Sequence, residues 1–147
     1  MENPLPDVSH PRLRNLLAFW EARRGDRTMP AREALDPLAL WEWLGHLMLI
    51  EAVDGGQFRY RVYGTGLAEY HGRDLTGKTT AMLRSDVRAV VCREYATVWR
   101  TARPLLVIHT RRIREQPTPL EKLILPFSTD GRTVDRLLAG AYPADRA

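Results

Sequence analysis

Apolar and polar residues follow two different periods along this chain, and the change of period predicts where helices give way to strands. Between Pro11 and Gly25 the apolar residues recur at helical spacing, with arginine and glutamate between them. This pattern predicts an amphipathic helix that begins near the proline and ends at the glycine. The same spacing returns from Ser85 to the residue before Pro104 and predicts a long second helix. The apolar stripe of the first helix consists of Leu13, Leu16, Leu17 and Trp20.

Five other segments have the length and apolar content of strands. They are residues 46–53, 57–64, 105–113, 119–128 and 133–142. Short helices are expected near residue 36 and over residues 66–71. Strands grouped at both ends of a helical middle predict an α+β fold with an antiparallel sheet. Because apolar residues occupy both faces of the last strands, we expect the central helices on one face of the sheet and the N-terminal helix on the other.

The length of 147 residues suits one domain with a single core. We expect residues 10–143 to form it, with flexible tails at residues 1–9 and 144–147. The single cysteine, Cys92, excludes an internal disulfide and a cysteine-based metal cluster, and no metal site is expected. No apolar run is long enough to span a bilayer, and the N-terminus lacks the layout of a signal peptide. We therefore expect a cytoplasmic protein with no membrane partner.

The chain is basic, with a net charge of +4 that comes from 20 arginines and only two lysines. A basic excess raises the hypothesis of nucleic-acid binding. The densest run, residues 111–114 (RRIR), lies at the end of a predicted strand, and 18 acidic residues dilute the rest of the charge. We interpret the run as a solvated edge and do not expect a nucleic-acid partner.

Residues 72–79, GRDLTGKT, match the pattern of a phosphate-binding loop. Such a loop needs a buried strand directly before it and a helix directly after it. The residues before Gly72 are polar and mixed, and those after Thr79 are a weak helix candidate. We therefore expect no nucleotide site in this segment.

Four motifs occur in an order and spacing that resemble a bacterial group of single-domain proteins of the PAS family. They are Trp20–Gly25, Met29–Arg32, Asp36–Pro37 and Phe58–Thr65. The resemblance covers residues 10–142. It implies a five-stranded antiparallel sheet with helices on one face, to which the N-terminal amphipathic helix is added, and a small pocket between sheet and helices. Members of the family are sensors that bind a small molecule, a cofactor or a protein partner.

We expect eight residues to line such a pocket. They are Tyr60, Arg61, Tyr70, His71, Met82, Tyr95, Trp99 and His109. Strand alternation predicts that Tyr60 and Val62 share one face of the second strand, while Arg61 and Tyr63 share the other. If Arg61 points into the pocket, it favours an anionic ligand. The alternative is an ion pair with Glu51 on the neighbouring strand.

The cofactor stays open. Cys92 lies within the long helix and lacks the neighbouring asparagine of the flavin-binding light sensors that belong to the PAS superfamily. None of the four histidines lies in the long helix, where some PAS domains hold haem through a histidine. Neither cofactor is therefore assigned from the sequence.

The function that the resemblance implies is a sensory or regulatory module without catalysis, which binds a small molecule or a partner protein. We expect it to work as a homodimer through a symmetric seam on the first helix. That seam comprises Leu13, Leu16, Leu17 and Trp20. The alternatives are a protein-interaction domain with a filled core, a small α+β enzyme whose cavity holds an unrecognised acid–base pair, and a nucleic-acid binder. The enzyme would require turnover of a pocket ligand that His71→Ala or His109→Ala abolishes.

Overall fold

Five antiparallel strands form the central layer of the protein, whose computed structural model describes residues 5–144. Their order in the sheet is β2-β1-β5-β4-β3. The strands are β1 (Leu47–Ala52), β2 (Phe58–Tyr63), β3 (Leu105–Ile113), β4 (Gln116–Phe127) and β5 (Arg136–Pro143). All five predicted strands are present, with bounds shifted by at most three residues.

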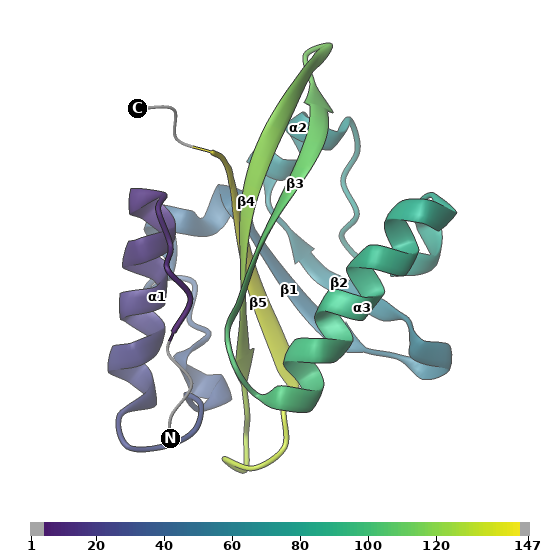
Figure 1. Cartoon of the computed structure of the whole chain (residues 1–147). Coiled ribbons are helices and arrows are strands. Elements are labelled where there is room, and N and C mark those ends of the chain that lie inside the picture. The colour runs from purple at the N-terminus through teal and green to yellow at the C-terminus, as the bar shows by residue number, and fades with distance from the viewer. Residues whose placement is uncertain (1–4, 145–147) are drawn as a thin grey trace.

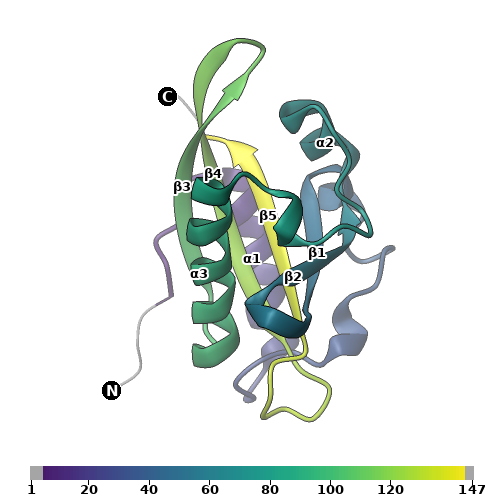
Figure 2. The same cartoon turned by 90° about the vertical axis from the view of Figure 1, so that its right-hand side faces the viewer.

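Helices cover both faces of this sheet and produce three layers (Figure 1). The long helix α3 (Ser85–Thr101) and the short helix α2 (Thr65–His71) lie on one side, and α1 (Pro11–Arg24) packs on the other side (Figures 1 and 2). Within the described residues, four 3₁₀ turns connect these elements: η1 (Arg32–Ala34), η2 (Trp41–His46), η3 (Asp54–Gly56) and η4 (Thr80–Met82). The α+β prediction with an added N-terminal helix is confirmed. None of the described helices combines the length and the apolar content needed to cross a membrane.

The apolar stripe of α1 packs directly onto the sheet. Its members are Leu13, Leu16, Leu17 and Trp20, none of them more than 9% exposed. The Trp20 indole donates a hydrogen bond of 2.8 Å to the carbonyl oxygen of Pro126 in β4. A Cβ at Gly140 of β5 would come within 2.8 Å of Leu16 Cδ2, so glycine there allows the close approach of the helix. The expected dimer seam on these four side chains is corrected, because they are buried in the core of their own chain.

The segment before α1 is partly packed, in contrast to the flexible N-terminal tail expected. Val8 is buried, and the Ser9 hydroxyl donates a hydrogen bond of 3.0 Å to the buried Glu121 carboxylate of β4. These contacts hold the chain against the sheet just before the helix begins. The outer parts of both expected tails, residues 1–4 and 145–147, lie outside the described residues.

A bulge in β2 changes the face that its last residues present. Leu49 of β1 pairs with Val62, whereas the next residue of β1 pairs with Tyr60. Arg61 is therefore the extra residue, and such a bulge redirects the side chains that follow it. Tyr63 turns to the α3 side together with Tyr60, and Val62 turns to the α1 side. The prediction from strict alternation is wrong for Val62 and Tyr63 for this reason.

Residues 72–79 form a loop that covers the outer edge of β2. Gly72 ends α2 in the left-handed conformation, with φ at 79°. The Gly77 amide then donates to the carbonyl oxygen of Tyr60 at 2.7 Å, and the Tyr60 amide donates to that of Lys78 at 2.9 Å. The loop follows a helix and leads into the three-residue turn η4, so it lacks the strand-loop-helix context of a phosphate-binding loop. Its pairing with β2 protects an edge of the sheet instead.

Candidate functional site

A cavity of about 220 Å³ lies between the sheet and the elements on its α3 side. All five strands contribute to its floor, while α2, the loop after it and the first half of α3 form its roof. Val87 and Val91 lie one helical turn apart, so both point from α3 into the cavity. Much of the apolar wall consists of Met48, Leu75, Leu83, Val87, Val91 and Leu120.

Lys122 lies on the floor of this cavity, in β4. Register places it opposite Val107 of β3 and Ala141 of β5, and only 7% of it is exposed. Its Nζ is 3.6 Å from Glu94 Oε1 and 3.5 Å from the Tyr95 hydroxyl, both on α3. Burial lowers the pKa of Lys122 to about 8, although the Glu94 carboxylate opposes this shift. The cavity is therefore built next to a buried cation at neutral pH.

Two tyrosines add hydroxyl groups beside Lys122, Tyr60 from β2 in the lining and Tyr95 from α3 behind it. The hydroxyls of Tyr60 and Tyr95 share a hydrogen bond of 3.0 Å, and the Phe58 ring packs edge-on against Tyr95 with centroids 5.4 Å apart. Burial raises the pKa of Tyr60 to about 12 and raises the pKa of Tyr95 well above its usual value. Both hydroxyls are therefore neutral at pH 7, and each can donate and accept a hydrogen bond.

Two histidines complete the polar groups that line the cavity, and His71 is the exposed one. His109 Nε2 on β3 is 2.8 Å from Glu94 Oε2 and so connects β3 to α3. His71, the last residue of α2, shares a hydrogen bond through Nδ1 with the Tyr63 hydroxyl. Burial and two nearby cations lower the pKa of His71 to about 4. Its imidazole is therefore neutral at pH 7.

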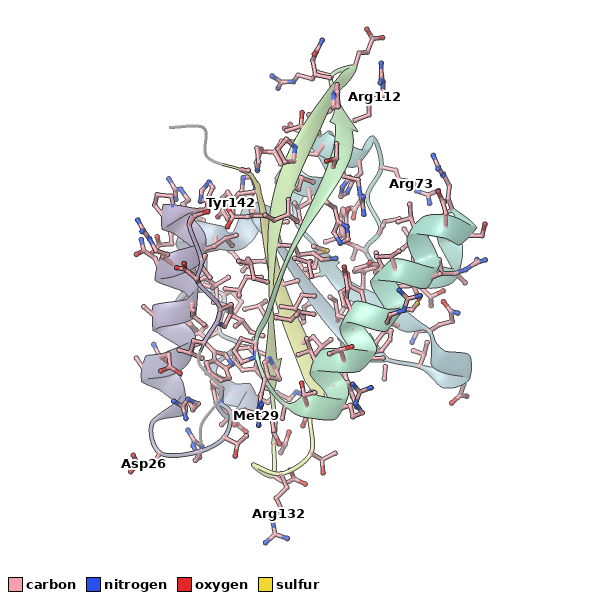
Figure 3. All side chains as sticks on the ribbon, in the orientation of Figure 1. Asp26, Met29, Arg73, Arg112, Arg132 and Tyr142 are labelled. Atoms are coloured by element: carbon pink, nitrogen blue, oxygen red, sulfur yellow. The ribbon has the colours of Figure 1, made fainter. Side chains whose placement is uncertain are left out.

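Three arginines surround the mouth of the cavity. Arg73, in the loop after α2, lies beside the N-terminal end of α3 (Figure 3), and its Nη2 donates to the carbonyl oxygen of Met82 at 2.7 Å. Arg84 forms an ion pair of 2.8 Å with Asp86. Arg111 extends from β3, is half-buried and lines the cavity. Asp86 offsets the charge of Arg84, so Arg73 and Arg111 supply the positive charge at the mouth that favours the entry of anions.

A family model for the PAS domain matches residues 8–142. The chain belongs to the PAS domain family. PAS domains are sensory modules that bind small molecules or protein partners and are in general not catalysts. No curated protein matches the sequence.

Solved structures share the fold of this PAS domain at low sequence identity. The PAS domain of BvgS from Bordetella pertussis has a TM-score of 0.57 and 9% identity, and the alignment covers 74% of this chain and 83% of that one. A light-oxygen-voltage domain studied with a flavin analogue has a TM-score of 0.55 and 11% identity, over 78% and 89% of the two chains. A fungal light-oxygen-voltage photoreceptor has a TM-score of 0.52 and 17% identity, over 90% and 91%. These likenesses support the fold alone.

Half of the residues expected at the pocket of this PAS domain lie at the cavity. Tyr60, His71 and His109 line it. Tyr95 lies behind the lining, where it holds the hydroxyl of Tyr60 and contacts the ammonium of Lys122. Tyr60 and His109 lie on the face that the helices cover, but alternation alone did not decide which face this would be, since Arg61 on the opposite face of β2 was also expected at the pocket.

The other four expected residues do not line the cavity. Arg61 lies on the bulge and forms an ion pair of 3.2 Å with Glu51, so the alternative weighed from the sequence is confirmed. Met82 is 48% exposed at the end of η4. Trp99 lies two turns beyond the valines of the roof and packs against an aromatic ring of β2. Tyr70 packs against a histidine of η2.

Lys122, Arg111 and Tyr63 are among the residues lining the cavity of the PAS domain that sequence reasoning missed. Lys122 carried a detectable signal, since it lies in the apolar run LEKLIL, and a lysine between residues buried on both faces of a sheet must itself be buried. Arg111 was assigned with its neighbours to a solvated edge, which holds for Arg112 and Arg114 but not for the half-buried Arg111. Tyr63 reaches the cavity through the bulge, for which strict alternation makes no allowance.

Proposed function

We propose that this PAS domain binds a small organic molecule in the cavity between the sheet and α3, and that it passes the binding event to a partner without catalysing a reaction. The cavity itself supports this proposal. Ligand sites are typically concave and mostly apolar, with a few polar groups that orient the ligand. A cavity of about 220 Å³ also argues against the filled-core alternative.

A flavin, suggested by the light-oxygen-voltage neighbours, does not fit this cavity. A cavity of about 150 Å³ accommodates a single benzene ring, and one of about 220 Å³ is too small for a tricyclic isoalloxazine. Cys92, the single cysteine of the chain, is also absent from the lining, and its Sγ contacts Thr80 Oγ1 at 3.3 Å. Within residues 5–144, no three histidine, cysteine or acidic side chains form a group that could hold a metal ion.

Filling the cavity tests the proposal with a matched pair of variants on one helix. Val87 lines the cavity, whereas Val90 is exposed on α3 and does not. We expect native mass spectrometry of the freshly purified protein to detect a bound small molecule. Val87→Trp should lose this mass because the larger ring occupies the cavity, and Val90→Trp should retain it.

The contradicting result is a clean apo mass for the unaltered protein, together with an unchanged melting temperature across a panel of neutral, acidic and basic metabolites. That outcome would favour the filled-core interaction domain. Turnover of a cavity ligand that His109→Ala abolishes would contradict the absence of catalysis.

We also propose that two copies of the chain associate. The contact would use exposed apolar residues outside α1, because the apolar stripe of α1 is buried. Leu38 and Trp41 are 83% and 74% exposed, and exposed apolar side chains that gather in one patch mark protein contacts. They lie beside a shallow apolar groove on the α1 side of the sheet, which Leu40, Leu44 and Val62 help to line. Dimers are common among PAS domains, which supports a second copy of the chain as the partner that binds at this groove.

A further inference from the structure

The charges around the cavity do not balance. Its lining contains four arginine and lysine side chains and, among the described residues, no carboxylate. Asp86 neutralises Arg84 at the mouth. Inside, Glu94 faces Lys122 at 3.6 Å but lies closer to His109, at 2.8 Å. One carboxylate is thus shared between two basic groups, and the cavity keeps a positive excess.

The ammonium of Lys122 has no short hydrogen bond or ion pair with a described residue, although it also lies 4.8 Å from the centroid of the Tyr95 ring. Its contacts of 3.6 Å with Glu94 and 3.5 Å with the Tyr95 hydroxyl are longer than the roughly 2.7–2.9 Å typical of charge-assisted hydrogen bonds. An ammonium carries three donors. The pKa of Lys122 is accordingly lowered by burial more than Glu94 raises it. A buried cation in this condition is stabilised by an anion that enters the cavity.

Arg111 brings a second cation to the same space. It lies on the cavity side of β3, and its charge lowers the pKa of both Lys122 and His71. The structure gives it a single weak hydrogen bond of 3.4 Å to the carbonyl oxygen of Thr110, and no ion pair with a described residue. A guanidinium presents a planar fork of donors that matches a carboxylate.

The volume limits the size of the anion. A cavity of about 150 Å³ holds benzene, so about 220 Å³ corresponds by proportion to roughly nine non-hydrogen atoms. The apolar wall, to which Met48, Val91 and Leu120 contribute, requires that most of these atoms be hydrocarbon. A single ring or a short alkyl chain meets both conditions.

We propose that the cavity binds an organic monocarboxylate of about this size, whose carboxylate lies between the Lys122 ammonium and the Arg111 guanidinium. Its apolar body then packs against the wall, and the neutral hydroxyl of Tyr60 lies beside it. The inference rests on the proposed ligand-binding function and adds the chemical class of the ligand.

Matched acids and amides test the inference directly. We would titrate the full chain with benzoate and benzamide, and with hexanoate and hexanamide, and follow the amide resonances of Val87 and Val91 by NMR. Each acid should bind roughly ten- to a hundredfold more tightly than its amide, since hydrogen bonds to a charged group contribute more than neutral ones. Lys122→Met should remove this preference and leave amide binding unchanged.

The chain offers a matched control for that variant. Lys78, the second of its two lysines, lies in an exposed loop outside the cavity lining, and Lys78→Met should keep the preference for acids. Arg111→Gln provides an independent variant at the half-buried rim and should weaken acid binding in the same direction.

Labelling the lysines with ¹³C gives a readout that no global change in stability would reproduce. With only two lysines in the chain, the Cε signal of Lys122 can be assigned from Lys122→Met. Benzoate should shift its titration midpoint to higher pH, while that of Lys78 should stay in place. A midpoint that does not move would overturn the assignment of Lys122.

The outcomes separate this inference from the function on which it rests. Acids and amides that bind equally, with binding lost in Val87→Trp, would overturn the anion assignment and leave the cavity as a ligand site. Binding of none of the four probes would overturn the carboxylate inference. The ligand-binding function itself would fall only if, in addition, the native mass were ligand-free and the melting temperature stayed unchanged across the metabolite panel.

Discussion

Lys122 concentrates the chemistry of the site in one side chain. Of the 22 arginine and lysine residues in the chain, 20 are arginine. The cation that is buried next to the cavity is nevertheless a lysine. A lysine ammonium is compact and changes its pKa readily on burial. The groups that face it are Glu94 and Tyr95 from α3 and, at longer range, Arg111 from β3.

Lys122→Met should therefore make the protein more stable at pH 7. The pKa of Lys122 is lowered from 10.5 to about 8 in the folded state, so its charged form destabilises the fold below pH 8. Between about pH 8 and 10.5 the unfolded chain binds more protons than the folded protein. By linkage, the free energy of unfolding therefore rises by about 3 kcal/mol over this pH range. We expect urea unfolding to show a gain of about 1–3 kcal/mol for Lys122→Met at pH 7, and little change for Lys78→Met.

The gain should shrink as the measurement moves from pH 7 to pH 10, where the native lysine is neutral. A loss of stability in Lys122→Met would show instead that the Glu94 contact holds α3 on the sheet. The sign of the change in the free energy of unfolding in Lys122→Met thus distinguishes a destabilising buried charge from a stabilising contact with Glu94. A stabilised variant that has lost acid binding would show the conflict between stability and function that is common at binding sites.

At the scale of elements, close packing of two glycines sets the position of α2. An ideal Cβ at Gly64, the residue before α2, would lie 2.3 Å from the carbonyl oxygen of Gly45 in η2. That neighbour is backbone and cannot rotate away. At Gly45 an added Cβ would meet nothing closer than 3.8 Å. The start of α2, and with it His71 at the cavity, depends on this approach.

Gly64→Ala should destabilise the protein by about 2 kcal/mol or more, because the added methyl group overlaps fixed backbone atoms. Gly45→Ala is the control on the facing residue and should change the free energy of unfolding by less than about 1 kcal/mol. Thermal and urea unfolding of both variants would measure the difference. Equal effects would mean that η2 and α2 move apart without cost, contrary to the packing described.

At the scale of the whole molecule, α1 acts as part of the core, and self-association needs another surface. We expect sedimentation velocity to find dimers at tens of micromolar. Trp41→Arg should convert them to monomers, because a charge replaces an exposed apolar contact. Its effect on the free energy of unfolding of the monomer should stay within about 0.5 kcal/mol, as for most surface substitutions.

Leu16→Ala is the contrasting variant, since Leu16 is fully buried beneath α1. It should lower stability by about 2–5 kcal/mol, the usual range for removing a buried leucine side chain, and leave the dimer intact. A monomeric Leu16→Ala protein that is still folded would restore the seam first expected on α1. A native protein that is monomeric at these concentrations would contradict the dimer itself.

The sequence by itself determined the elements and their arrangement in layers. Helical spacing in the stripe of α1, the run from Ser85 to Pro104 and the strand-like segments all depend on local periodicity, which a chain shows before it folds. Tyr60 and His109 were among the residues expected at the pocket, and the Arg61–Glu51 ion pair was one of the two roles of Arg61 that the sequence left open.

The tertiary structure alone decided the site. One extra residue at Arg61 turned Tyr63 inward, and the register of β3, β4 and β5 surrounded Lys122 on both sides. Whether Trp99 or Val87 lines a cavity depends on where α3 crosses the sheet, which is a long-range property that no local pattern contains. A cavity and the pKa of a lysine beside it arise from contacts between segments far apart in the chain, so they exist only once the fold has brought those segments together.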